Sequence, residues 1–262
     1  PYDSAFDALS KIKGTVLLDK SRTCAKAAAV VNGRSDAQIV SGTQVTTILK
    51  SRKTPAELDA LRNAMVTDGV ALAETFAWVA ECDANATKIT ESDVADFLHE
   101  ARAKSPDFFD ESFTTIAAWG PNAAEPHYTP KKDTAAELLQ DNVLLVDSGA
   151  QYTGGTTDVT RTVAVGRPTP EMKRDFTAVL RGHIAIATTR FPKGAYAAQL
   201  DTLARAPIWA IGADYGHGTG HGVGFHLSVH EGPAHISPRC PTTDDTRLVP
   251  GIVISIEPGL YR

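Results

Sequence analysis

Two threonine–proline helix starts, Thr54-Pro55 and Thr169-Pro170, constrain the fold of this chain more than any other local feature. Threonine is a favoured N-cap residue, proline is favoured at the first helical position, and Glu57 is placed to close a capping box. The first start predicts a long helix to about Cys82, and the second predicts one to about Arg190. Each start therefore opens one of two regions that the chain builds in the same way.

The same order of elements, two helices followed by short β-rich segments, occurs after each start. In both regions the periodicity changes after the helices, and Gly, Pro and Asn separate the segments that follow. This order predicts an α+β fold in which two similar halves join their sheets. The further predicted segments are helices from Thr90 to about Ala103 and from about Ala197 to Ile211, and strands at Ser112–Ala118, Val143–Asp147, Asp158–Val165, Val223–Val229 and Ile252–Ile256.

Residues 1–50 lack a clear helix start and are interpreted as the remnant of a preceding domain and its connection. They contain a strand candidate, Gly14–Leu18, and an alanine-rich stretch from Cys24 to Val31. We expect residues 51–262 to form the main domain.

The composition argues against several classes of partner. A net charge of −5 offers no basic surface for nucleic acid or for an anionic membrane. No apolar stretch approaches the roughly 20 residues that span a bilayer. The three cysteines, Cys24, Cys82 and Cys240, form no CxxC pair, which fits a reducing compartment. We therefore expect a cytoplasmic protein that binds neither nucleic acid nor membrane.

Two aspartates, Asp147 and Asp158, lie eleven residues apart in the run VDSGAQYTGGTTDVTRTV. Gly154-Gly155 between them supply turn chemistry, so a hairpin would bring both carboxylates together. An aspartate beside glycine usually bonds local backbone, whereas two adjacent carboxylates repel each other unless a cation lies between them or one is protonated. Local reasoning leaves both interpretations open, turn residues or metal ligands.

Four of the eight histidines fall between His217 and His230. Glycine at every second position lets the backbone turn tightly around His217 and His221. Solvated loop histidines are the ordinary alternative, but this clustering favours a site, and imidazole added to carboxylates suits manganese, iron, cobalt or zinc. His226 has no glycine or carboxylate context and is assigned a structural role.

Glu257 follows the β-rich run 251–256 and precedes Pro258-Gly259. A carboxylate at the end of a buried strand is poorly placed for simple solvation, so the position favours a role as ligand or base. His127, which lies in the loop segment EPHY, is uninformative on local grounds.

Four segments together resemble the pita-bread metallopeptidases, and within them the Xaa-Pro aminopeptidases (aminopeptidase P) of the larger, cytosolic three-domain type. The segments are DSGAQYTGGTTDVTRT from Asp147, HGTGHGVG from His217, VHEGP from Val229 and EPGLY from Glu257. The resemblance implies hydrolysis of the bond between an N-terminal residue and a following proline. It also implies peptide substrates with proline in the second position and a homodimer.

The resemblance implies a site for two divalent metal ions, most commonly Mn²⁺. Asp147 would bind one metal, Asp158 would bridge both, and His221 and Glu257 would bind the second. Two such ions can lower the pKa of a bridging water and polarise the scissile carbonyl.

Catalytic roles follow from the same resemblance. His127 and His230 match the histidines that contact substrate and stabilise the intermediate, and His217 matches a further histidine of the active site. Glu257 is also the candidate general base for the metal-bridging water.

The sequence departs from the family pattern at its C-terminus. The family has a further bridging glutamate shortly after the Glu-Pro-Gly segment, and the sequence ends at Arg262 before reaching it. We expect residues 51–262 to be a catalytic domain truncated at its C-terminus. The metal held by Asp147 and Asp158 would then be weakly bound or absent, and the fragment weakly active or inactive.

Two other functions remain open. A prolidase shares the metal ligands but cleaves only Xaa-Pro dipeptides. The sequence TGGTTDVTRT resembles aminopeptidase P more than a prolidase. Methionine aminopeptidase is a poorer match, because the sequence around both histidine segments differs from that family's. A non-catalytic binding module on the same fold is the second alternative, against which the retained ligands argue for the parent protein.

Overall fold

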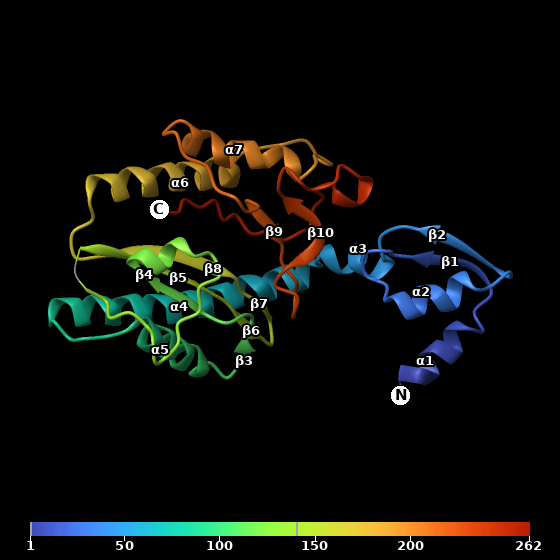
Figure 1. Cartoon of the computed structure of the whole chain (residues 1–262), viewed down its shortest axis with the longest axis horizontal. Helices are drawn as coiled ribbons and strands as arrows, with labels where there is room; N and C mark the ends of the chain where they lie inside the picture. The colour runs from blue at the N-terminus through green and yellow to red at the C-terminus, as the bar shows by residue number, and fades with distance from the viewer. Residues whose placement is uncertain (1, 140) are drawn as a thin grey trace. The chain divides into compact units, whose positions relative to one another are not determined.

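A computed structural model describes residues 2–139 and 141–262 and divides the chain into two compact units, Pro1–Lys50 and Ser51–Arg262 (Figure 1). In the first unit, β1 and β2 pair in parallel, which requires the crossover that α2 provides. The strand predicted at Gly14–Leu18 is confirmed. The elements are α1 (Tyr2–Leu9), β1 (Gly14–Leu18), α2 (Ala25–Asn32), β2 (Ala37–Ser41) and α3 (Val45–Ser51), which ends at the division.

The first half of the second unit begins with two capped helices, α4 (Pro55–Ala84) and α5 (Glu91–Ala103). Thr54 and Glu57 form the expected capping box at α4, and Thr90 caps α5 in the same way. Both predicted helices are therefore confirmed. Although α4 has 30 residues, no helix in the described part of the chain is long and apolar enough to cross a membrane.

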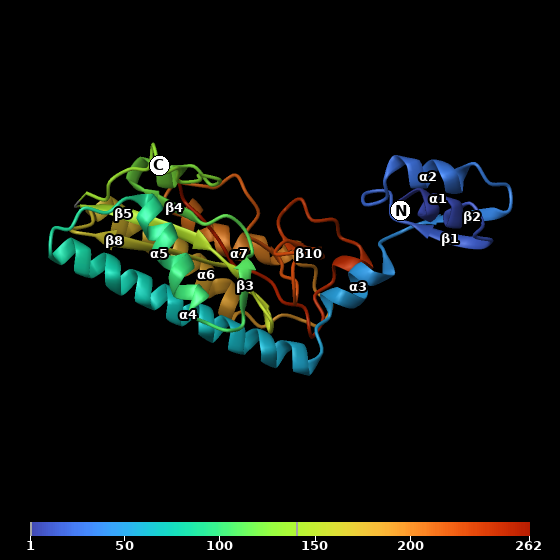
Figure 2. The same cartoon turned by 90° about the horizontal axis from the view of Figure 1, so that it is seen from below.

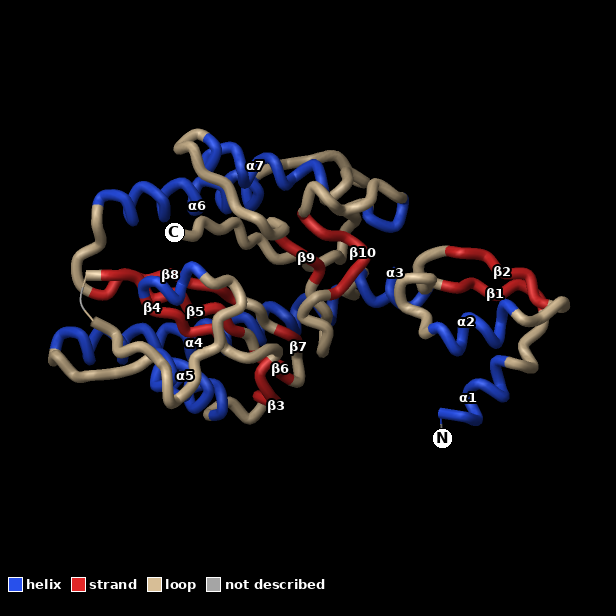
Figure 3. Tube along the Cα trace, in the orientation of Figure 1, coloured by secondary structure: helices blue, strands red, loops and turns tan. Residues whose placement is uncertain are grey.

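These helices pack on a three-stranded antiparallel sheet of β4 (Ile116–Trp119), β5 (Asn142–Ser148) and β8 (Val159–Val165) (Figures 2 and 3). Leu144 and Val146 of β5 are fully buried in the core that the sheet shares with both helices. Burial of such side chains is the main force that holds the helices on the sheet. The strands predicted near Val143 and Asp158 are thereby confirmed.

The hairpin expected between the two aspartates is present and has a second sheet at its tip. β5 pairs with β8, while β6 (Ala150–Tyr152) pairs with β7 (Gly155–Thr156) around the turn. β3 (Phe108–Glu111) pairs with the other edge of β6. The strand predicted at Ser112–Ala118 is only partly correct, because residues 112–115 lie between β3 and β4 outside any strand.

The second half repeats the helical pair with α6 (Pro170–Thr188) and α7 (Ala198–Trp209), as predicted. The C-terminal segment extends between this pair and the β4-β5-β8 sheet (Figure 1). The isoleucines at 252, 254 and 256 pack against the cluster that contains Leu200 and Ala204 of α7. This packing fixes the position of the end of the segment relative to α7.

Three segments of this half differ from expectation. The strand predicted at Val223–Val229 is wrong, because these residues form a loop in which Leu227 and Ser228 have positive φ. A strand that was not predicted, β10 (Glu231–Ile236), follows and pairs with β9 (Gly220–Gly222). The predicted strand at Ile252–Ile256 is extended and bridges Gly222 through Ile254, without a continuous ladder. The strands of the described residues form four separate sheets rather than a closed barrel.

Candidate metal centre

Three of the predicted site residues converge on one point. Nε2 of His221 lies 3.2 Å from Oδ2 of Asp158 and 3.0 Å from Oε1 of Glu257. One ligand atom from each of these residues lies within 4.8 Å of the other two. Two carboxylates and an imidazole at this spacing are a donor set for a divalent cation.

The backbone explains why these three side chains meet. Asp158 directly precedes β8, and His221 is the central residue of β9. The segment that ends at Glu257 lies beside β9, since His221 O accepts from Ser255 N at 2.8 Å and Thr219 O accepts from Glu257 N at 2.7 Å. This approach requires glycine at position 220, where a Cβ would lie 2.0 Å from the Ser255 carbonyl oxygen.

The ring of His221 is oriented for a ligand at Nε2. Its Nδ1 lies 2.9 Å from Gly222 O, a carbonyl to which only an N–H can bond. Metal-binding histidines commonly donate their second ring N–H to a backbone carbonyl in this way. Burial opposes a charge on His221, but hydrogen bonds to Asp158 and Glu257 outweigh it and raise the pKa of the imidazole to about 10.

Glu257 stays ionised beside this imidazolium. Burial alone would raise the pKa of the carboxyl, but hydrogen bonds from His221 and Ser255 hold it below the usual value. Ser255 Oγ donates to Oε1 of Glu257 at 2.6 Å and accepts from His221 N at 2.9 Å. Ser255 therefore orients a carboxylate and a backbone segment of the candidate centre at once.

Asp147 lies on β5, opposite Thr160 of β8, and is not one of the three clustered ligands. Its Oδ1 is buried without a hydrogen-bond partner. Burial raises the pKa of this carboxyl to about 6, a hydrogen bond from Thr160 opposes the rise, and the charges of Asp158 and Glu257 add to it. A buried carboxylate oxygen without a donor, next to further carboxylates, fits a nearby cation.

The two predicted substrate histidines lie at the edge of this cluster. The His230 ring is edge-on to the His221 ring, with centroids 4.2 Å apart. Burial and the positive charge of His221 lower the pKa of His230, so this imidazole is neutral at physiological pH. His127 is exposed, and its charge also acts on His230.

His217 is held by a tyrosine that the sequence reasoning did not single out. Its Nε2 lies 2.7 Å from the Tyr261 hydroxyl and its Nδ1 lies 2.7 Å from Gly218 O. The charge of His217 helps to lower the pKa of Glu257, which places it near the same centre. Tyr261 lies in the EPGLY segment, four residues after Glu257, and Ser255 lies two residues before Glu257. His226 lies apart, exposed, with its ring 6.0 Å from that of Phe109.

The chain is similar to several known proteins. The sequence profile of metallopeptidase family M24 matches residues 59–262. A probable Xaa-Pro aminopeptidase P from Laccaria bicolor is 42% identical over the whole chain, which covers 41% of that protein. The chain thus spans about two fifths of the length of this relative.

Two solved structures are similar as well. The cytosolic X-prolyl aminopeptidase of Caenorhabditis elegans, described as having a di-nuclear active site, is 35% identical with a TM-score of 0.91, over all of this chain and 43% of that one. An Xaa-Pro dipeptidase from Bacillus anthracis is 25% identical with a TM-score of 0.79, over 99% of this chain and 69% of that one. These likenesses confirm the predicted α+β pita-bread fold.

Proposed function

Because the chain belongs to metallopeptidase family M24, we propose that it is the catalytic region of a metal-dependent Xaa-Pro aminopeptidase. Such an enzyme hydrolyses the peptide bond between an N-terminal residue and a following proline. The convergence of Asp158, His221 and Glu257 on one point carries the proposal, since it assembles a cation site from both halves of the fold. The names of the fungal and worm relatives support the substrate class.

The proposed site holds two divalent ions. Asp158, His221 and Glu257 would hold one, and Asp147 with Asp158 would contribute to the other. Mn²⁺ is proposed because the set is rich in carboxylate oxygen and contains imidazole. Bound ions of this kind lower the pKa of water and polarise a carbonyl group.

The remaining chemistry is assigned to side chains of the chain. Glu257, held ionised by Ser255 and His221, would accept a proton from the attacking water. Neutral His230 would donate a hydrogen bond to the reacting carbonyl oxygen, and charge on that oxygen strengthens such a bond. His127 and His217 are proposed to contact the substrate.

Further parts of the proposal concern the location, assembly and domain organisation of the protein. A cytoplasmic location follows the description of the worm enzyme as cytosolic. A homodimer and Mn²⁺ as the cellular metal stay predictions, which sedimentation and metal analysis of the purified protein would test. Residues 1–50 are proposed to belong to a preceding domain and residues 51–262 to the metallopeptidase domain.

Prolidase activity is a second candidate, because the Bacillus anthracis dipeptidase shares the fold. The test compares hydrolysis of an Xaa-Pro-Xaa tripeptide with that of an Xaa-Pro dipeptide by the full-length protein in added Mn²⁺. We expect cleavage of the tripeptide before proline, its loss in His221→Ala and its retention in the exposed control His226→Ala. Cleavage of the dipeptide alone would establish a prolidase. A full-length protein that binds no metal and cleaves neither peptide would be a binding module.

A further inference from the structure

Each half of the second unit contains a buried arginine that binds an aspartate and also contacts the chain next to candidate metal ligands. Arg102 is 1% exposed and Arg205 is 6% exposed. Taking a guanidinium out of water is costly, and a buried ion pair is often no more stabilising than apolar residues of the same size. Stability alone therefore explains neither arginine well.

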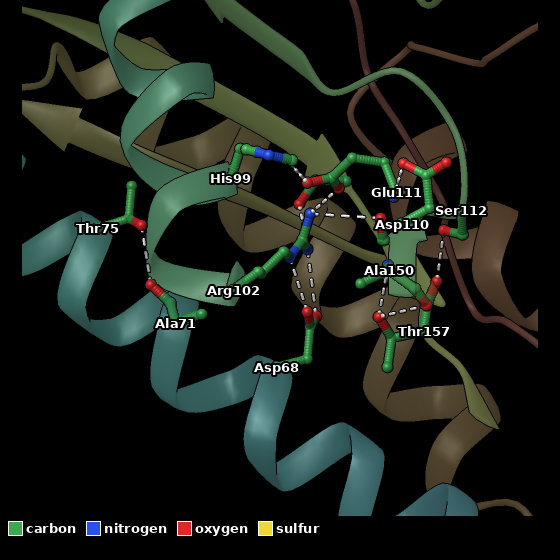
Figure 4. Close-up of polar contacts among 12 residues, drawn as sticks. Asp68, Ala71, Thr75, His99, Arg102, Asp110, Glu111, Ser112, Ala150 and Thr157 are labelled. Atoms are coloured by element: carbon green, nitrogen blue, oxygen red, sulfur yellow. Dashed lines mark hydrogen bonds and ion pairs between the residues drawn. The ribbon is translucent and has the colours of Figure 1, made fainter. Parts of the chain in front are cut away.

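In the first half, Arg102 of α5 joins α4 to the strand that bears Asp147 (Figure 4). Its Nε donates to Asp68 Oδ1 at 2.8 Å. Its Nη2 donates to Ser148 Oγ at 3.0 Å, and its Nη1 donates to Gly149 O at 3.3 Å and to Glu111 Oε2 at 2.6 Å. Ser148 directly follows Asp147, so this arginine holds the side chain one residue beyond a proposed ligand and the backbone carbonyl two residues beyond it.

The pair Ala150 and Thr157 links the segment that Arg102 contacts to the segment that bears Asp158. Ala150 N donates to Thr157 Oγ1 at 2.9 Å, and Thr157 N donates to Ala150 O at 2.8 Å. A Cβ at Gly149 would lie 2.0 Å from Thr157 O, so the two segments are in direct backbone contact. Thr157 precedes Asp158. The position of both aspartates thus depends on the backbone that Arg102 holds.

In the second half, Arg205 of α7 binds the loop that leads to His221. Its Nε donates to Asp201 Oδ2 at 2.7 Å. The other nitrogens donate to Tyr215 O at 2.7 Å and to His217 O at 2.8 Å. The guanidinium also covers the Tyr215 ring, 3.9 Å from its centroid.

Asp201 continues this contact to the two remaining ligands. Its Oδ1 accepts from Thr219 Oγ1 at 2.6 Å. The backbone oxygen of Thr219 accepts from Glu257 N at 2.7 Å, and Thr219 lies two residues before His221. Thr219 is fully buried, so water cannot replace Asp201 as the partner of its hydroxyl.

We propose that these two arginine–aspartate pairs, named here the clamps, are positioning residues that hold the four ligand-bearing segments of the metal centre in register. The proposal rests on the proposed function. Each clamp pairs an arginine with an aspartate and adds a tyrosine and a hydroxyl side chain, although the two clamps occur in different halves. The first clamp is Arg102, Asp68, Tyr152 and Ser148, and the second is Arg205, Asp201, Tyr215 and Thr219.

The test measures Co²⁺ affinity of the full chain by visible absorbance and backbone opening by hydrogen exchange. Asp68→Asn and Asp201→Asn each remove one clamp charge while keeping the shape of the side chain. Glu91→Gln is the matched control. Glu91 is also a fully buried helical carboxylate, and it binds Trp119 N and Ala136 N, far in sequence from any ligand.

We expect each clamp variant to weaken Co²⁺ binding by about tenfold, the low end of the loss seen when partners that orient ligands are removed. Exchange should rise at residues 148–157 in Asp68→Asn and at residues 215–221 in Asp201→Asn, each without the other. Glu91→Gln should change neither. Equal Co²⁺ affinities and equal exchange patterns in all three variants would overturn the proposal.

A second pair of variants tests the second clamp even if Asp201→Asn does not fold. Thr219→Val removes the hydroxyl that Asp201 binds at nearly constant volume, whereas Thr219→Ser keeps it. We expect Thr219→Val to reproduce Asp201→Asn and Thr219→Ser to behave as wild type, and the same loss in both would count against the clamp. If the wild-type chain binds no Co²⁺, the proposed function fails, and the exchange pattern alone decides whether the clamps exist.

Discussion

His221 Nε2 lies 3.0 Å from Glu257 Oε1, on the side of the ring opposite the nitrogen that bonds Gly222 O. Without metal, this nitrogen carries a proton that both neighbouring carboxylates stabilise. The same nitrogen is the only ring atom free to bind a cation. Proton and metal therefore compete for one lone pair.

Metal binding should release a proton from His221. Its pKa is raised to about 10, so the imidazole is charged at pH 7.5, whereas Asp147, with a pKa of about 6, is already ionised. We expect about one proton released at pH 7.5 when the ion held by Asp158, His221 and Glu257 binds, and an apparent affinity for that ion that rises about tenfold per pH unit between these two pKa values. Calorimetry in buffers of different ionisation enthalpy measures the release. A pH-independent affinity would contradict this assignment.

Glu257→Gln should separate binding from hydrolysis. The amide oxygen still faces the cation, but it cannot take a proton from water. We expect hydrolysis of Xaa-Pro-Xaa peptides to fall by about 10²- to 10⁴-fold, the range for loss of a general base. Co²⁺ binding should persist with reduced affinity. The control is His226→Gln, and unchanged turnover in Glu257→Gln would exclude this glutamate as the base.

Gly220→Ala should disturb the centre, because the new Cβ would lie 2.0 Å from Ser255 O. Moving that backbone apart should cost about 1 to 3 kcal/mol in the free energy of unfolding. Gly216→Ala, in the segment just before β9, is the matched control, since nothing lies within 4 Å of its Cβ. Urea unfolding of both variants tests the difference. A neutral Gly220→Ala would show that β9 and the C-terminal segment can separate at no cost.

Lys53→Met should destabilise the fold strongly. Its ammonium binds Glu231, and the two side chains are only 1% and 7% exposed. Removing one partner of a buried ion pair costs about 3 to 5 kcal/mol. The comparison is Lys104→Met, whose pair with Glu74 is exposed and worth about 0 to 1 kcal/mol. Equal shifts in the urea midpoint would mean that Lys53 contributes no more than a surface charge.

The sequence predicts the helices of this fold well because their start signals are local. Thr54 and Thr90 bond the first turn of their own helices, and no distant residue is needed to recognise them. The loop at Val223–Val229 is different, because its apolar residues suggest a strand. Its backbone instead bonds the other half, where Phe225 O accepts from Thr156 N and Leu227 N donates to Gln151 Oε1. Such partners cannot be read from local sequence.

The candidate site shows the same limit. The histidine and carboxylate segments are visible in the sequence, and the structure brings Asp158, His221 and Glu257 together. Their supports are less visible. Asp201 and Arg205 have the spacing of an ordinary surface pair on a helix, and only burial distinguishes them from one. Residues that act through the backbone of another segment leave no motif.

The origin of the ligands in two separate halves has a consequence for a newly made chain. Asp158 comes from the first half, and His221 and Glu257 come from the second. Neither half can assemble this donor set alone, so the centre exists only once both have docked. The proposed hydrolysis would thereby depend on completed folding, because a molecule in which only one half has folded lacks part of the donor set.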